Sequence, residues 1–185
     1  LQTQLEQVGT YEALAFTERL ALLLDQESLS RDTRKQQRLI TQARFRVAAH
    51  LQELDYHTSR HLKREQIAQL ATGEWIAKGQ NLLLTGPCGS GKTYLGCALD
   101  EAACRRDYSV RYYRLSRLFL EMTQAKAEGA YQKFLQLLSK TQLLILDDWG
   151  METLVPSARH DLMEVMDDRY GRGSTLVISQ LPTDQ

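Results

Sequence analysis

Four short apolar runs in the later part of the chain are bounded by polar and turn-forming residues. They cover residues 81–85, 109–113, 143–147 and 175–179, and continuous apolar runs of this length are typical of central parallel strands. Between them, apolar residues recur at helical spacing over residues 91–106, 116–127, 131–138 and 156–170. Strands that alternate with helices predict an α/β fold, with a parallel, doubly wound sheet and helices on its faces.

The first part of the chain shows helical periodicity alone. An amphipathic helix is predicted from about residue 11 to residue 25, on the spacing of Phe16, Leu20, Leu23 and Leu24. A second helix is predicted from its cap Ser30 to about Leu54, because apolar residues continue on one face at Ile40, Ala43, Val47, Leu51 and Leu54. We therefore predict a small, all-helical N-terminal domain over residues 1–62 and an α/β domain over residues 63–185, joined through residues 62–80.

Composition narrows the class of protein. The chain has 185 residues, 43% of them hydrophobic, and no apolar stretch near the roughly 20 residues of a membrane span. It has no charged-then-apolar secretory start either, so we expect a cytoplasmic protein without a membrane partner. Three cysteines without a C-x-x-C spacing argue against a disulfide framework or a zinc site. Because the sequence begins at Leu1 rather than Met and ends at Gln185, shortly after a strand, we expect a segment of a longer protein.

The formal net charge is zero, but the charges are segregated along the chain. Residues 28–64 contain nine Lys or Arg against three acids, whereas residues 141–170 contain two against seven. On the second predicted helix, a stripe at positions i, i+3, i+4 and i+7 lies roughly opposite the apolar face and consists of Arg31, Arg34, Lys35 and Arg38. Such a stripe is either a solvated face or a surface for a polyanion, and both interpretations stay open.

A glycine-rich loop directly follows the first predicted strand. Its sequence, Gly86-Pro87-Cys88-Gly89-Ser90-Gly91-Lys92-Thr93, matches the pattern G-x-x-x-x-G-K-[ST]. Glycine lets the main chain curl so that its N–H groups point at phosphates, and the helix that begins near Gly91 adds the positive end of its dipole. We expect Lys92 to reach the β- and γ-phosphates of ATP as a catalytic residue, and the Thr93 hydroxyl to bind Mg²⁺. These eight residues and Tyr94 are the predicted nucleotide-binding residues; a chance glycine turn is the alternative.

The third predicted strand ends in two acids, Asp147 and Asp148. Asp147 is expected to hold Mg²⁺, directly or through water. Asp148 is expected to orient or activate the water that attacks the γ-phosphate, unless it only caps the turn before Gly150. Gln180, after the last strand, is the predicted γ-phosphate sensor, with closing the turn before Pro182 as the alternative. The strands that carry the loop and the acids could be adjacent in space, and the second acid favours ATP hydrolysis over transfer to a small acceptor.

Several longer strings resemble the IstB transposition helper ATPases, the AAA+ partners of IS21-type transposases and close relatives of the DnaC helicase loaders. The strings are NLLLTG at 81–86, LLILDDWG at 143–150, DRYGR at 168–172 and STLVISQLP at 174–182, together with ERLALLLD at 18–25 and Asp55-Tyr56. The resemblance thus covers nearly the whole chain. Its Asp-Asp-Trp-Gly and Ser-Gln-Leu-Pro strings are more specific than the loop alone.

The resemblance implies an AAA+ P-loop ATPase with ATP and Mg²⁺ as cofactors. It implies a protein that oligomerises with itself on duplex target DNA, without sequence preference, and recruits or stimulates a transposase. A small helical lid is implied after Gln185, with an arginine finger for the neighbouring subunit, so we expect weak ATP hydrolysis by this segment alone. Arg169 and Arg172 are substitutes for that arginine, and packing of the fold or contact with DNA phosphates explains them equally well. Two other functions stay open: a DnaC-like loader that binds a replicative helicase and single-stranded DNA, and an ATP-switched protein-binding module without significant turnover.

The expected contacts with DNA come from basic residues in two segments. They are Arg31, Arg34, Lys35, Arg38, Arg44 and Arg46 in the first segment, and Arg111, Arg114 and Arg117 around the second strand. Tyr112 and Tyr113 interleave with the second group and could stack on exposed bases, although the alternation of a strand places at least one of them in the core. No base-reading motif is visible, so we expect contacts mainly with phosphates and a strong dependence on salt.

Overall fold

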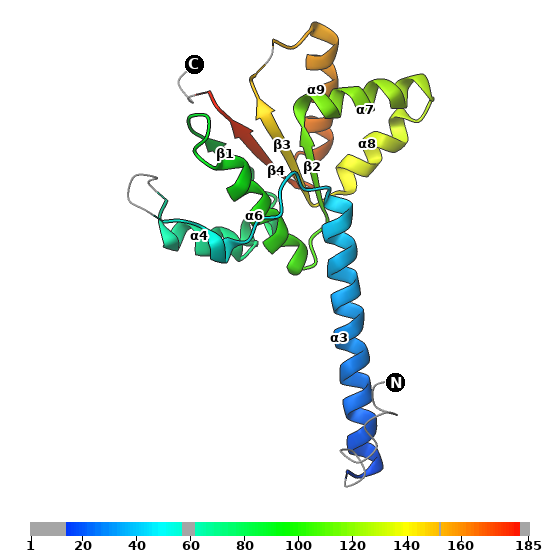
Figure 1. The fold of residues 1–185 in the computed structure, drawn as a ribbon. Coiled ribbons are helices and arrows are strands. Elements are labelled where there is room, and N and C mark those ends of the chain that lie inside the picture. The colour runs from blue at the N-terminus through cyan, green and yellow to red at the C-terminus, as the bar shows by residue number, and fades with distance from the viewer. Residues whose placement is uncertain (1–13, 57–61, 152, 182–185) are drawn as a thin grey trace. The chain divides into compact units, whose positions relative to one another are not determined.

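The computed structural model of the chain describes residues 14–56, 62–151 and 153–181. Its four-stranded sheet consists of β1 (Leu82–Thr85), β2 (Val110–Arg114), β3 (Leu143–Trp149) and β4 (Ser174–Ser179). The strand order is β1-β4-β3-β2, and all three pairs are parallel (Figure 1). The predicted α/β fold with a parallel sheet is confirmed, and each strand begins and ends within two residues of its expected range.

Helices connect the strands. The four that we predicted between the strands are present as α6 (Lys92–Arg105), α7 (Leu115–Ala127), α8 (Tyr131–Lys140) and α9 (Pro156–Arg169). The segment predicted as a connection forms α4 (Arg64–Ala71) and α5 (Glu74–Ala77) before β1. Among the described residues, no helix combines the length and the apolar character that a membrane crossing needs.

The predicted pair of N-terminal helices is wrong. One helix, α3, runs from Phe16 to Ala43, and a 3-10 turn follows at Leu51–Glu53. No Gly or Pro interrupts residues 16–43, so nothing in the sequence ends a helix near residue 25. The helix ends where Arg44 takes the left-handed conformation, with φ of 59°. The predicted apolar face is therefore limited to Ile40 and Ala43, because the three later positions lie beyond the helix.

The contacts divide the chain into two compact units, Leu1–Arg38 and Leu39–Gln185. In the first unit, the described part of α3 carries the predicted basic stripe, and all four of its residues are exposed. The last turn of α3 belongs to the second unit, where Leu39 and Ala43 are buried in the core. The predicted boundary between residues 62 and 63 concerns which segments fold on their own, and it stays a prediction.

The sheet is covered on both faces. Helix α6 packs on one face, with Cys97 and Cys104 fully buried against side chains that include Leu143, Ile145, Leu176 and Ile178. Helices α7, α8 and α9 pack on the other face (Figure 1), where the core includes Leu118, Leu138, Leu144, Leu146 and Val165. Both buried cysteines thus serve packing. Burial of alternate residues on both faces explains why the strands read as continuous apolar runs.

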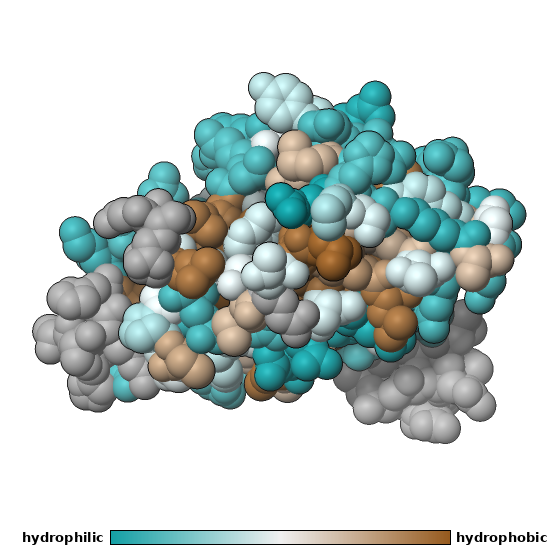
Figure 2. Space-filling model, turned by 90° about the horizontal axis from the view of Figure 1, so that it is seen from above, coloured by the Kyte–Doolittle hydropathy of each residue, from teal (hydrophilic) through white to brown (hydrophobic). Residues whose placement is uncertain are grey.

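The position of β4 corrects one prediction. The strand of the glycine-rich loop, β1, and the strand of the two acids, β3, are not adjacent, because β4 lies between them and pairs with both. All the strands are parallel, so their carboxyl ends lie at the same edge of the sheet, where the arrowheads point in Figure 1. Figure 2 looks down on the surface of this side, where hydrophilic and hydrophobic residues are intermixed. Gly86, Asp147 and Gln180 all lie at this edge, which is where α/β proteins bind ligands.

Candidate functional site

The glycine-rich loop leaves β1 and turns into α6. Gly86, Gly89 and Gly91 have φ values of 154°, 77° and 87°, a range that favours glycine because side chains with a Cβ rarely adopt it. Gly91 is the N-terminal cap of α6, and no side chain caps the helix there. The first turn of the helix therefore presents its N–H groups and the positive end of its dipole to the loop, which favours an anion.

The Lys92 side chain folds over this loop. Its Nζ atom donates to the carbonyl oxygens of Gly86 at 2.6 Å and Pro87 at 2.7 Å, and it lies 3.4 Å from Ser90 Oγ. The ammonium group is thereby held inside the curl of the loop. Phosphate oxygens placed there would replace these neutral carbonyl acceptors with charged ones, which the ammonium group binds more strongly.

Asp147 and Thr93, the two residues predicted to bind a metal, lie side by side. Asp147 is 2% exposed, and its Oδ2 atom accepts a hydrogen bond from Thr93 Oγ1 at 2.9 Å and another from the Tyr112 hydroxyl at 2.5 Å. Its Oδ1 atom accepts the N–H of Asp148 at 2.8 Å. Burial, together with the hydrogen bond to Asp147, raises the pKa of Tyr112, so the phenol stays protonated and remains the donor.

Asp148 stands at an irregularity of the sheet. The register between β3 and β4 shifts between Leu146 and Trp149, and Asp148 has φ of 60°. Asp tolerates this left-handed conformation better than most residues do. The bulge re-aims the side chain, and the Asp148 carboxylate, one-third exposed, lines the same cavity as Lys92.

A cavity of about 400 Å³ brings these groups together. It is lined by Arg46, Val47, Cys88, Gly89, Gly91, Lys92, Thr93, Asp147, Asp148, Ile178 and Gln180. Ser179, in contrast, is fixed in the turn, because its hydroxyl donates to the Trp149 carbonyl and accepts the N–H of Leu181, both at 3.1 Å. Of the two polar residues at the end of β4, Gln180 is thus the one that lines the cavity.

A second cavity, of about 840 Å³, begins at the same loop and shares Gly91 and Lys92 with the first. Its apolar walls come from Leu54, Leu62, Leu84 and Leu95. Tyr94, predicted to bind nucleotide, lines it as well; its hydroxyl donates to Glu53 at 2.8 Å and accepts the N–H of His50 at 3.4 Å. An apolar pocket beside a phosphate-binding loop suits the base and sugar of a nucleotide.

The residues present fit a nucleotide with Mg²⁺. Phosphates fit the glycine curl, and the Thr93 hydroxyl with the Asp147 carboxylate forms an oxygen donor pair of the kind that Mg²⁺ prefers. No group of three or more His, Cys, Asp and Glu residues that could hold a metal occurs in the described ranges. This also suits Mg²⁺, since that ion is usually held by one or two carboxylates together with water and substrate phosphates.

Comparison with known proteins identifies the family of the chain. The family model of the IstB-like ATP binding proteins matches residues 2–185. The chain belongs to this family. It is 49% identical over 172 residues to the ATP-binding protein of insertion sequence IS1162 from Pseudomonas fluorescens, an alignment that spans 92% of this chain and 74% of that protein.

Two solved structures have a fold similar to that of this IstB-like protein. The DnaC helicase loader aligns with a TM-score of 0.59 at 20% identity, over 77% of this chain and 80% of that one. DnaA from Aquifex aeolicus, bound to AMPPCP, aligns with a TM-score of 0.65 at 18% identity, over 75% of this chain and 44% of that one. At these identities the likeness establishes a shared fold alone.

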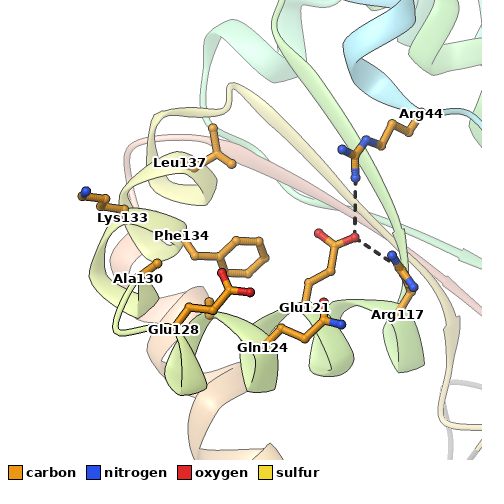
Figure 3. Close-up of a pocket in the computed structure, with 10 residues that line it drawn as sticks. Arg44, Arg117, Glu121, Gln124, Glu128, Ala130, Lys133, Phe134 and Leu137 are labelled. Atoms are coloured by element: carbon orange, nitrogen blue, oxygen red, sulfur yellow. Dashed lines mark hydrogen bonds and ion pairs between the residues drawn. The ribbon is translucent and has the colours of Figure 1, made fainter.

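The basic residues predicted to contact DNA lie in several separate parts of the protein. Arg44 and Arg117 both pair with Glu121, at 3.5 and 3.2 Å (Figure 3). These three residues line a groove of about 480 Å³ between α7 and α8. Arg111 is partly exposed on β2 and Arg114 is exposed at its end, whereas Arg46 lies at the acidic pair. On α3, Arg31 pairs with Glu27 at 2.9 Å.

The structure decides between the alternatives for the two tyrosines and for Arg169. Tyr112 and Tyr113 are both buried, at 7% and 4% exposure, so neither ring is available for stacking on DNA bases. Arg169 is buried at 2% exposure in its own fold, where its guanidinium donates to the Leu138 and Thr141 carbonyl oxygens, among others. It is therefore a packing residue and not a trans-acting arginine, whereas Arg172 is exposed.

Sequence reasoning missed two residues of the site, Tyr112 and Arg46. Both act on Asp147 from segments that are 35 and 101 positions away along the chain. No spacing rule connects such positions, so only the pairing of β2 with β3 and the path of the chain after α3 could bring them to the acid.

Proposed function

We propose that this protein binds and hydrolyses ATP with Mg²⁺, and that bound ATP drives its assembly on duplex DNA, where it recruits a transposase. The observation that carries the proposal is the single cavity that Lys92, Thr93, the two acids and Gln180 line together. In the proposed reaction Lys92 stabilises the phosphates, Asp148 orients water, and Gln180 contacts the γ-phosphate. Relatives encoded by insertion sequences support transposition as the process.

The first test measures DNA binding by the full-length protein. Fluorescence anisotropy of a labelled duplex and of the matching single strand is recorded with and without ATP·Mg²⁺, at two salt concentrations. We expect ATP-dependent binding to the duplex that weakens by roughly 10³-fold between 50 and 200 mM salt, if about six phosphates are contacted. Preference for the single strand would favour a helicase loader, and no DNA binding would leave an ATP-dependent switch that acts on a protein.

Lys92→Ala tests the role of ATP. The substitution removes the cation that the loop holds, and we expect ATP binding to weaken by roughly 10-fold or more, together with assembly on DNA. Lys78→Ala is the matched control, because Lys78 pairs with Glu74 on the surface, four residues away on the chain. Assembly of the Lys92 variant at wild-type ATP concentrations would refute the claim that ATP drives it.

Asp148→Asn tests hydrolysis separately from binding. Asn keeps the size of the side chain and also tolerates the left-handed backbone of this position. We expect ATP and DNA to bind as before while phosphate release falls by at least about 10²-fold, the typical contribution of a positioned acid–base group. Equal turnover would remove Asp148 from the reaction.

A further inference from the structure

Arg46 lies at the centre of the proposed metal site, three residues beyond the end of α3. Its Nη1 atom is 3.8 Å from Asp147 Oδ2 and also 3.8 Å from Asp148 Oδ2. The side chain is 46% exposed, and it lines the cavity that Lys92 and Gln180 also line. One guanidinium thus bridges the two carboxylates that the proposed function assigns to Mg²⁺ and to water.

Asp147 Oδ2 is the atom on which these interactions converge. Thr93 and Tyr112 donate hydrogen bonds to it, and the Arg46 charge faces it. The contacts of Thr93 and Tyr112 are neutral, so the local positive charge comes from Arg46. An arginine guanidinium stays a cation throughout the physiological range, so this charge is always present.

We propose that the Arg46 guanidinium and Mg²⁺ compete for the carboxylates of Asp147 and Asp148, so that Arg46 sets the concentration of Mg²⁺ that nucleotide binding requires. The inference rests on the proposed Mg²⁺ site. Two cations beside the same pair of acids repel each other, so the presence of one lowers the affinity of the site for the other. By thermodynamic linkage, bound Mg²⁺ must weaken the interaction of Arg46 with the acids by the same free energy by which Arg46 weakens the binding of Mg²⁺.

The size of this effect on Mg²⁺ affinity follows from the exposure of the Arg46 side chain. Because Arg46 is nearly half exposed and 3.8 Å from each acid, its pairing belongs to the weak, solvent-screened class. Loss of such a pair corresponds to roughly a two- to five-fold change in the apparent affinity for Mg²⁺. The effect is small, but it has a defined direction: removal of Arg46 must strengthen binding of the metal.

The test titrates Mg²⁺ at a fixed concentration of a fluorescent ATP analogue, with wild type, Arg46→Ala and Arg46→Lys. We expect Arg46→Ala to reach half-maximal binding of the analogue at a two- to five-fold lower Mg²⁺ concentration. Arg46→Lys, which keeps the charge, should lie between wild type and the Ala variant. Thermal unfolding of each variant verifies that it is folded.

Arg105→Ala is the matched control, since it removes the same charge from a surface side chain that pairs with Glu101 and not with Asp147 or Asp148. Its Mg²⁺ requirement should equal that of wild type. An unchanged or higher requirement in Arg46→Ala would overturn the inference, and weaker binding of the analogue also in EDTA would show that Arg46 contacts phosphate instead. Failure of the wild type to bind the analogue at any Mg²⁺ concentration would refute the proposed function as well.

Discussion

Asp100, on the helix that follows the glycine-rich loop, is a buried acid without a hydrogen-bond partner among the described residues. Its side chain is 0% exposed, and both carboxylate oxygens lack a donor. Burial raises the pKa of the Asp100 carboxyl well above its ordinary value, and the charge of Asp147 raises it further. The folded protein therefore favours the protonated acid, whereas the unfolded chain ionises near pH 4.

The sign of the effect on stability follows from proton binding. Between about pH 4 and the raised pKa, the folded state holds a proton that the unfolded state has lost, so the free energy of unfolding falls as the pH rises. One such proton gives a slope of about 1.4 kcal/mol per pH unit. Below about pH 4 Asp100 is protonated in both the folded and the unfolded state, so it no longer lowers the free energy of unfolding.

Asp100→Asn removes this titration with little change of shape. Urea unfolding followed by tryptophan fluorescence, at pH 5, 6 and 7, gives the free energy of unfolding of both proteins. We expect the free energy of unfolding of the Asn variant, relative to that of wild type, to rise by up to about 1.4 kcal/mol for each pH unit. The contributions of the other titrating groups cancel in this difference. Parallel pH profiles would refute the argument, since they would mean that Asp100 has the same pKa in the folded and unfolded states.

Three further substitutions test the packing and the site. Gly96→Ala should lower the free energy of unfolding by about 1–3 kcal/mol in urea, because the added methyl would lie 2.6 Å from Ile178 Cδ1; an unchanged value would mean that α6 shifts freely. Arg169→Met removes the guanidinium donor from three buried backbone carbonyls, of which that of Leu138 keeps a hydrogen bond from the Thr141 N–H. It should cost about 3 kcal/mol or more, with unfolding near wild-type urea concentrations as the contrary result. Tyr112→Phe removes one donor to Asp147 and should alter the Mg²⁺ dependence of nucleotide binding at little cost in stability; an identical Mg²⁺ titration would exclude a positioning role.

The sheet could be predicted from the sequence because its strands are buried on both faces. Leu143 to Leu146 are all fully buried, so the whole run had to be apolar whichever way each side chain points. The glycine-rich loop was predictable for another reason, since its residues are consecutive and their spacing is set by the phosphate they fit. In both cases the information is local in the chain.

What the sequence could not supply was information carried by distant segments. The strand order that places β4 between β1 and β3 depends on crossovers whose lengths fit either arrangement. The unbroken helix α3 was missed because Ser30 suits a cap as well as an exposed helix position, and propensity alone cannot decide between them. Stacking of Tyr113 on DNA bases was considered for the same reason. Helices cover both faces of the sheet at β2, so Tyr112 and Tyr113 are buried on opposite faces.

The left-handed backbone of Asp148 limits which acids can serve at this position. With φ of 60°, a residue pays least strain here if it is Gly, Asn or Asp, whereas the longer Glu tolerates the conformation less well. The step from Asp148 to Glu would therefore require the bulge between β3 and β4 to relax at the same time. Local geometry thus favours Asp over Glu at this position, and an exchange for Glu would need a second change in the strand.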